Sequence, residues 1–311
     1  MLRPLTPEQT RTHYERAITN RSPEALAASG ADLGALALSD ALRNQQSGKL
    51  DHLRRGELEE IASPETRASF EQAFTSSERL VGYLGDPTIN APTPEDMVER
   101  GADISYLADA FEHMKTEGLD PHIVLTPHGL GAERWRKIAA EMTADASIPN
   151  NPLQARDDGH GLWISAEAEA NWYAFDKAPA ATTNPAHPGS LPTFETIAAN
   201  GDTISWTIRI IPGTSRPDHL GLSYKDAKAQ DIAHQTVPEM LTDKLTTIMV
   251  GKEPSDTIVD GSYYYSWCDN GDPAGAAAPC GRWNPGGGRV RVSWDGVGNR
   301  YDDLGSRPPV G

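Results

Sequence analysis

The chain has 311 residues, of which 38% are hydrophobic and 23% are charged, and this is ordinary for a globular protein that buries a core of about two domains. Its formal net charge is −16, divided into −9 for residues 1–150 and −7 for residues 151–311, so the acidity is spread along the chain. A surface of this sign repels phosphate, which argues against non-specific binding to nucleic acid or to an anionic membrane.

Residues 1–7 contain no apolar run of the kind found in a signal peptide. No stretch of the sequence reaches the apolar length that a membrane-spanning helix needs. We therefore expect no membrane span, and a cytoplasmic location by default.

The first third of the chain repeats one short sequence motif, a serine or threonine followed by proline and glutamate. The hydroxyl caps the first free amides of a helix, proline fits the first turn, and glutamate suits the positive end of the helix dipole. These starts predict at least four helices before residue 110, and they lie at Thr6-Pro7-Glu8, Ser22-Pro23-Glu24, Ser63-Pro64-Glu65 and Thr93-Pro94-Glu95.

The pattern then changes. Residues 121–126 are typical of a short buried strand, and residues 132–143 return to helical spacing. Polar residues with prolines and Asp-Asp-Gly over 146–160 indicate a linker. Residues 176–199 are rich in Pro, Ala and Thr and predict a loop, whereas residues 205–211 alternate as a strand does.

We therefore predict an α+β fold with two domains. Residues 1–145 form a helical domain of unknown role, 146–160 link the domains, and 161–311 form a loop-rich domain that holds six of the seven tryptophans. Within it, a serine cap at Ser223 and Pro238 as the first helical residue predict two short helices over 223–245. On spacing alone, these are two packed helices with no implied chemistry.

Glycine, tryptophan and arginine recur through the last thirty residues. Gly281, Gly288 and Gly305 allow tight turns, and Trp283 and Trp294 supply large rigid anchors in a region poor in regular structure. The arginines can bind backbone carbonyls or carboxylates and so hold loops together. The sequence also allows a local basic patch in this region, made of Arg282, Arg289, Arg291, Arg300 and Arg307.

These motifs resemble the formylglycine-generating-enzyme type of C-type-lectin fold. Leu222–Ala229 is similar to its V-S-W-x-D-A-x-A element, and Val237-Pro238-Glu239 loosely resembles the start of its second helix. The family's G-G-x-W turn, its arginine after small residues and its closing G-F-R or G-A-R are represented by Gly281–Asn284, Gly288-Arg289 and Gly305–Arg307. The resemblance covers roughly residues 200–311 and is closest to the variable proteins of diversity-generating retroelements.

That resemblance implies a ligand-binding protein rather than an enzyme, with a diversified, hypervariable surface at the C-terminal end. The anchors would be scaffold, and the polar residues between them would form the face that binds a protein or other macromolecular ligand. Polar, adaptable residues with a tyrosine are typical of binding loops, although exposed polar residues can also simply cover a surface. The candidate ligand-binding residues are Tyr264, Asn284, Asp295, Asn299, Arg300, Tyr301 and Asp302.

The alternative is an oxidoreductase on the same fold, either formylglycine-generating or iron-dependent and sulfoxide-forming. Cys268 and Cys280 lie upstream of the segment that holds the working cysteines of the first class. The nine histidines show no compact ligand spacing, and His122 and His128 suit structural roles better than metal binding. The two cysteines are either reduced, buried thiols or a disulfide that closes a short loop.

No cofactor is expected. Asp269, Asn270 and Asp272 offer the oxygen ligands of a structural calcium site, but they match only part of a calcium loop, which favours a tight polar turn. A third interpretation is an assembly protein whose helical part forms homo-oligomers.

Overall fold

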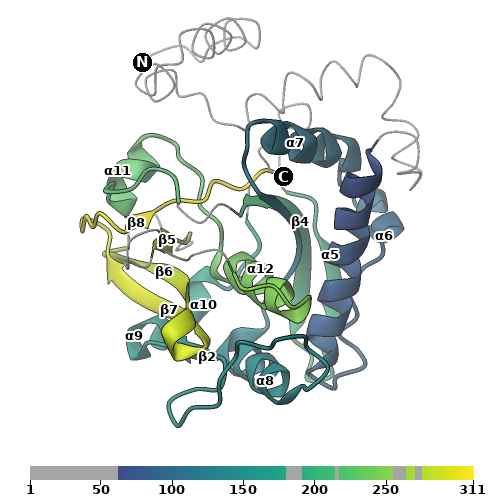
Figure 1. Ribbon diagram of the computed structural model, residues 1–311, viewed down its shortest axis with the longest axis horizontal. Helices are drawn as coiled ribbons and strands as arrows, with labels where there is room; N and C mark the ends of the chain where they lie inside the picture. Colours follow the sequence, from purple (N-terminus) through teal and green to yellow (C-terminus); the bar gives the residue numbers. More distant parts are fainter. Residues whose placement is uncertain (1–61, 180–190, 214–216, 255–263, 270–274) are drawn as a thin grey trace, which may run out of the picture.

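A computed structural model describes residues 62–179, 191–213, 217–254, 264–269 and 275–311, and every structural statement below concerns this part of the chain. The fold is α+β, as predicted. A three-stranded antiparallel sheet and a five-stranded mixed sheet are packed with helices (Figure 1). Two of the predicted helix starts, at Thr6 and Ser22, lie outside the described residues, so the helical N-terminal domain stays a prediction.

The other two predicted starts are confirmed. Ser63 accepts a hydrogen bond from the Thr66 amide at the start of α5 (Pro64–Gly82). Thr93 and Asp96 cap each other's amides at the start of α6 (Pro94–Glu99). The following helix, α7 (Ile104–Thr116), begins instead at an aspartate cap and buries its apolar stripe.

The three-stranded sheet has the order β1-β4-β3. Both predicted strands are confirmed, as β1 (Pro121–His128) and β4 (Thr203–Pro212), which pair antiparallel along their length. The loop predicted over residues 176–199 is wrong at its end, where β3 (Phe194–Ile197) pairs with β4. This strand is short, and its residues alternate between partly buried and exposed, so little apolar signal marks it.

Three short elements and one long helix lie around the predicted linker. The helix predicted at 132–143 is confirmed as α8 (Gly131–Ala144). After it come β2 (Leu162–Ile164), α9 (Ala166–Ala170) and α10 (Trp172–Phe175), none of which is among the predicted elements.

Two helices precede the second sheet, as predicted. Ser223 caps α11 (Tyr224–Ala229) by accepting the Asp226 amide. The next helix, α12 (Val237–Met249), begins one residue earlier than predicted, because the reciprocal cap between Thr236 and Glu239 makes Val237 the first helical residue.

The five-stranded sheet has the order β2-β7-β6-β5-β8. Its centre is the hairpin of β6 (Ala277–Asn284) and β7 (Arg289–Gly296), which turns through the short helix η2 (Pro285–Gly287). On the two sides of the hairpin lie β5 (Tyr265–Trp267) with β8 (Leu304–Gly305), and β2, which runs parallel to β7.

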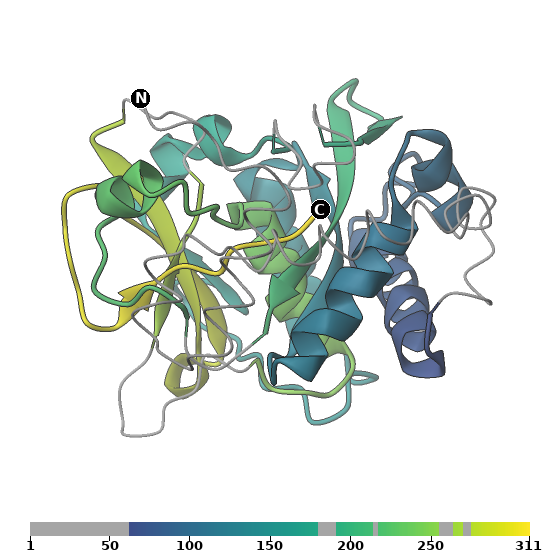
Figure 2. The ribbon, with the colours of Figure 1, turned by 90° about the horizontal axis from the view of Figure 1, so that it is seen from above.

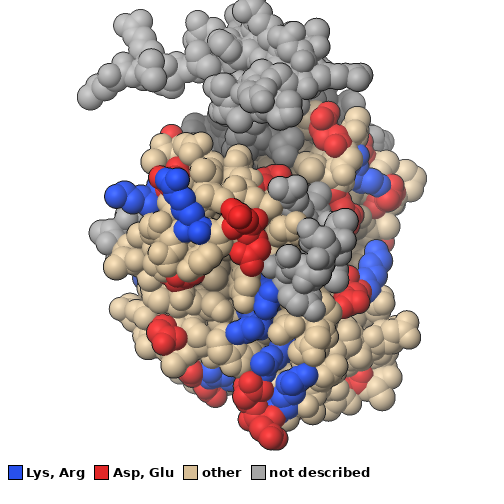
Figure 3. Space-filling model, turned by 60° about the vertical axis from the view of Figure 1, so that its left-hand side comes forward, with Lys and Arg blue, Asp and Glu red and all other residues tan. Residues whose placement is uncertain are grey.

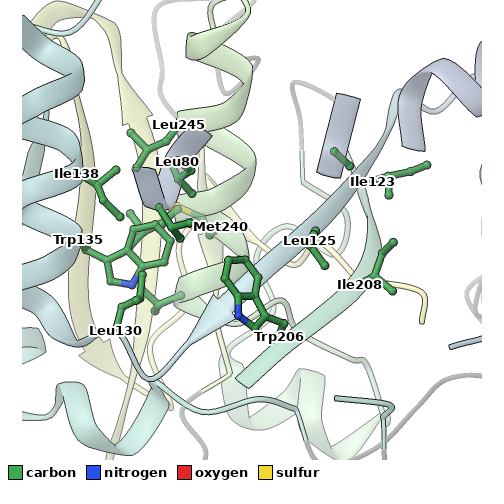
Figure 4. Packing of buried hydrophobic residues seen from close by; sticks show 14 of the residues in the cluster. Leu80, Ile123, Leu125, Leu130, Trp135, Ile138, Trp206, Ile208, Met240 and Leu245 are labelled. Atoms are coloured by element: carbon green, nitrogen blue, oxygen red, sulfur yellow. The ribbon is translucent and has the colours of Figure 1, made fainter. Parts of the chain in front are cut away.

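One continuous hydrophobic core joins both parts of the predicted domain division. The buried face of α12 packs between the two sheets, α7 lies against β1 and β4 of the three-stranded sheet, and α5 lies against β1 and also contacts α12 (Figure 2). Figure 4 shows Met240 and Leu245 of α12 beside Trp135 of α8 and Leu80 of α5. The predicted linker, residues 146–160, also contributes Ile148 and Leu153 to this core.

Candidate functional site at the C-terminal sheet

Two of the predicted anchors of the C-terminal segment, Trp283 and Arg307, are buried, whereas Trp294 and Arg289 are only partly buried. Trp283 is fully buried, and its indole nitrogen donates to Glu253 Oε1 at 3.0 Å. Arg307 is 1% exposed; its Nε donates to Ser266 Oγ at 3.0 Å and its Nη1 to the Pro212 carbonyl at 2.9 Å. The predicted role of this arginine, to hold loops together through backbone carbonyls, is confirmed.

Two of the predicted glycines sit where a side chain would collide. A Cβ on Gly281 would lie 2.3 Å from Met240 Cε and 2.9 Å from the Arg291 carbonyl oxygen. A Cβ on Gly305 would lie 2.4 Å from the Asp218 carbonyl oxygen. Close backbone packing at these positions therefore fixes the path of β6 and β8.

Four of the candidate ligand-binding residues form one exposed turn between β7 and β8, over residues 299–302. Tyr301 at its tip is 44% exposed, and Arg300 reaches across to Asp226 at 2.7 Å. Asn299 Nδ2 donates to Asp295 Oδ1 at 2.6 Å, which ties the turn to the end of β7. The negative charge of Asp295 raises the pKa of Tyr301. The structure thus brings five of the seven candidates together.

The remaining two candidates differ. Tyr264 is half-buried and lies beside the end of this turn, because the Tyr265 amide donates to the Asp303 carbonyl at 2.7 Å. Asn284 lies at the opposite end of the hairpin, opposite Arg289, and its Oδ1 caps η2 by accepting the Gly287 amide. Asn284 therefore has a structural role and does not belong to the surface formed by the turn 299–302.

A row of four side chains crosses the same sheet and was not predicted as a unit. Tyr265, Arg282, Arg291 and Trp163 stand in register on β5, β6, β7 and β2, all partly exposed on one face. The Arg282 guanidinium lies over the Tyr265 ring at 4.2 Å, and the Arg291 guanidinium lies over the Trp163 ring at 4.4 Å.

Arg282 and Arg291, at the centre of this row, are directly opposite each other on adjacent strands, and their guanidiniums lie over the rings of the two outer strands. Like charges in this position repel. Within the described residues, no carboxylate lies in ion-pair distance of Arg291, and its Nε has no hydrogen-bond partner. Figure 3, which turns the left-hand side of Figure 1 forward, shows a short line of lysine and arginine side chains with aspartate or glutamate side chains at both of its ends.

The signal for this row was only partly in the sequence. Arg289 and Arg291 alternate along one strand, and the arginine-rich end of the chain allows a local basic patch. The structure separates that patch, because Arg307 is buried and Arg289 pairs with Asp158 at 2.5 Å. Trp163 arrives from more than 120 residues earlier, which no local pattern indicates.

A second polar feature is a cavity of about 230 Å³ between α5, α7, β1 and α12. On its wall, His122 Nδ1 lies 2.5 Å from Asp243 Oδ1, and Nε2 lies 3.6 Å from Asp120. Burial disfavours the charged imidazole, but these two carboxylates outweigh it and raise the pKa of His122 to about 9. At neutral pH the ring is thus a paired cation, a poor general base.

The environment of the two thiols disfavours their ionised form. Cys268 belongs to the main core, whereas Cys280 belongs to a smaller cluster with Tyr224 and Trp267, and both are free and buried. Burial raises the pKa of Cys280 to about 12 and that of Cys268 well above its ordinary value. Because the thiolate is the reactive form, this setting does not favour the oxidase interpretation.

Of the three residues of the predicted calcium turn, Asp269 lies in the described part of the chain. Asp269 accepts the Tyr224 hydroxyl at 2.9 Å and lies 3.4 Å from Lys228 Nζ, while Asn270 and Asp272 lie outside the described residues. In the described part of the chain, no group of three or more acidic, histidine or cysteine side chains is arranged to hold a metal ion.

Among the helices of the described residues, none combines the length and the apolar character needed to cross a membrane. Comparison with protein-family models, with curated proteins and with solved structures gives no match for this chain.

Proposed function

We propose that the chain is a ligand-binding protein that recognises a protein ligand through the surface formed by Asp295 and the turn 299–302. The observation that carries this proposal is the separation of two residue sets within one short segment. The glycines at 281 and 305, Trp283 and Arg307 are packed tightly against their neighbours, whereas residues 299–302 are exposed. Such a surface can change its side chains without disturbing the packing beneath it.

We further propose that this surface is of the retroelement variable-protein type, on a C-type-lectin-like domain. Three features support the resemblance. Ile210 of β4 exchanges two backbone hydrogen bonds with Val310 at the end of the chain. Two capped helices, α11 and α12, follow β4, and the hairpin-bearing strands β5 to β7 follow the helices. The helices begin at the residues on which the resemblance was based.

The retroelement part has a genomic test. We expect a near-copy of the DNA that encodes residues 262–304, differing mainly at adenines, beside a reverse-transcriptase gene. A locus with neither the copy nor the gene removes this part of the proposal and leaves ligand binding itself untouched.

The binding part is tested by panning a random dodecapeptide display library on the full chain. We expect enriched peptides that lose binding when residues 299–302 are all changed to alanine. The midpoint of thermal unfolding should stay nearly constant, since exposed substitutions change stability by about 0.5 kcal/mol or less each.

A matched control carries four alanines on exposed helix positions away from the site, at Glu71, Thr75, Glu78 and Glu141. This variant should keep all the selected peptides. Peptides that bind both variants equally well, or a failure to enrich any sequence, would show that the turn is not a recognition surface.

A further inference from the structure

We infer that the row Trp163–Arg291–Arg282–Tyr265 is the part of the binding surface that receives a carboxylate-rich segment of the protein ligand. This inference rests on the proposed function and specifies the chemistry of its partner. The two arginines of the row lie on the same hairpin as Asp295, and the Tyr265 amide donates to the Asp303 carbonyl, next to the turn 299–302. One ligand can therefore touch both.

The geometry of the row favours an anion. Two arginines are direct partners on paired strands, and the guanidinium of each lies over the aromatic ring of an outer strand. Carboxylates beside the two arginines would relieve their mutual repulsion and accept hydrogen bonds from the guanidinium of Arg291, whose Nε has no hydrogen-bond partner in the described part of the chain. The arginines are fixed on strands rather than loops, so little side-chain freedom is lost on binding.

The composition of the surface favours a protein over a nucleic acid. Arginine, tyrosine and tryptophan are the residues that dominate binding energy in protein interfaces. Single-stranded nucleic acid binds largely by stacking bases on aromatic rings, and here one face of each ring already holds a guanidinium. The net charge of −16 repels an extended phosphate backbone, whereas a short acidic segment meets only the local positive row.

The test uses the full chain and a fluorescein-labelled octaglutamate peptide, followed by fluorescence anisotropy at 20 and 150 mM salt. We expect measurable binding that weakens as salt rises, because partly exposed charges are screened. Arg291→Gln should weaken binding about tenfold, as loss of a central interface arginine does. Arg282→Gln is the second variant and should give the same direction of change.

The matched control is Arg100→Gln. This arginine also lies over an aromatic ring, that of Phe194 at 5.7 Å, but it is exposed at the end of α6 and has no second arginine stacked beside it. Its loss should leave peptide affinity within about twofold. Removing one of two facing like charges should not unfold the protein, and thermal unfolding of each variant checks this.

Three results overturn the inference: no binding of octaglutamate, equal binding by the wild type and both row variants, or tighter binding of octathymidylate than of octaglutamate. A dimer that Arg291→Gln converts to monomer overturns it as well, since the row would then receive a second copy of this acidic chain. If octaglutamate does not bind but the selected peptides still depend on the turn 299–302, this inference is wrong and the proposed function stands. Selected peptides that ignore the turn but need Arg291 would reject the turn and keep the row.

Discussion

Arg307 and Arg300 look alike in the sequence but have opposite surroundings, and this contrast gives the sharpest prediction. Arg307 is buried and donates to the Ser266 hydroxyl and to the Pro212 carbonyl, which joins the C-terminal segment to β5 and β4. Changing it to methionine keeps much of the volume and removes both bonds. Each bond to a charged donor contributes about 1.5–3 kcal/mol, and each acceptor left buried without a donor costs about 1–3 kcal/mol.

The buried charge itself was expensive to desolvate, so part of this loss is returned when it is removed. We therefore expect Arg307→Met to lower the free energy of unfolding by about 3–5 kcal/mol, a large share of the roughly 5–15 kcal/mol of a typical domain. Urea unfolding followed by tryptophan fluorescence measures it as a lower midpoint at constant slope.

The control is Arg300→Met. The Arg300 side chain is 65% exposed and its ion pair with Asp226 faces solvent, so its loss should change stability by about 0.5 kcal/mol or less. A loss below about 1 kcal/mol for Arg307→Met, or equal losses for both variants, would refute the division of this segment into scaffold and face.

Two further predictions concern pH and packing. Burial lowers the pKa of His128 to about 3, so between about pH 6.5 and 3 only the unfolded chain binds a proton there, and stability falls on acidification. The pKa of His122 is instead raised to about 9. Its contribution to stability is therefore full below pH 6.5 and is lost as pH rises through 9. Urea unfolding at pH 5, 7 and 9 should show a maximum near pH 7, and His122→Gln should flatten the alkaline side; an unchanged alkaline side contradicts this. Gly281→Ala should destabilise the chain by about 1–3 kcal/mol because of Met240 and the strand backbone, whereas Gly298→Ala, with nothing within 4 Å, should be neutral in the same assay.

The elements that can be predicted from the sequence are those whose stabilising interactions join residues close together along the chain. Ser63, Thr93, Ser223 and Thr236 cap the helix that starts right after them, so four residues are enough to show the motif. The strands β1 and β4 carry long apolar runs, which periodicity detects.

The elements and contacts that were missed depend on distant partners. Three-residue β2 is a strand because it pairs with β7, about 125 residues later. Arg282 and Arg291 become neighbours through the register of the hairpin, and Trp163 joins them only once β2 is in place. Asn284 is a polar residue in a glycine-rich stretch by sequence, and only the fold reveals it as a cap.

The buried pair of Arg209 and Glu239 has a consequence for how the molecule opens. Arg209 Nη1 lies 3.1 Å from Glu239 Oε1, and its Nη2 donates to the Pro309 carbonyl, while Glu239 also accepts the Thr236 amide that begins α12. One cluster thus fastens β4, the first turn of α12 and the C-terminal segment. These three should exchange their amide hydrogens with a single, shared opening free energy, as one cooperative unit.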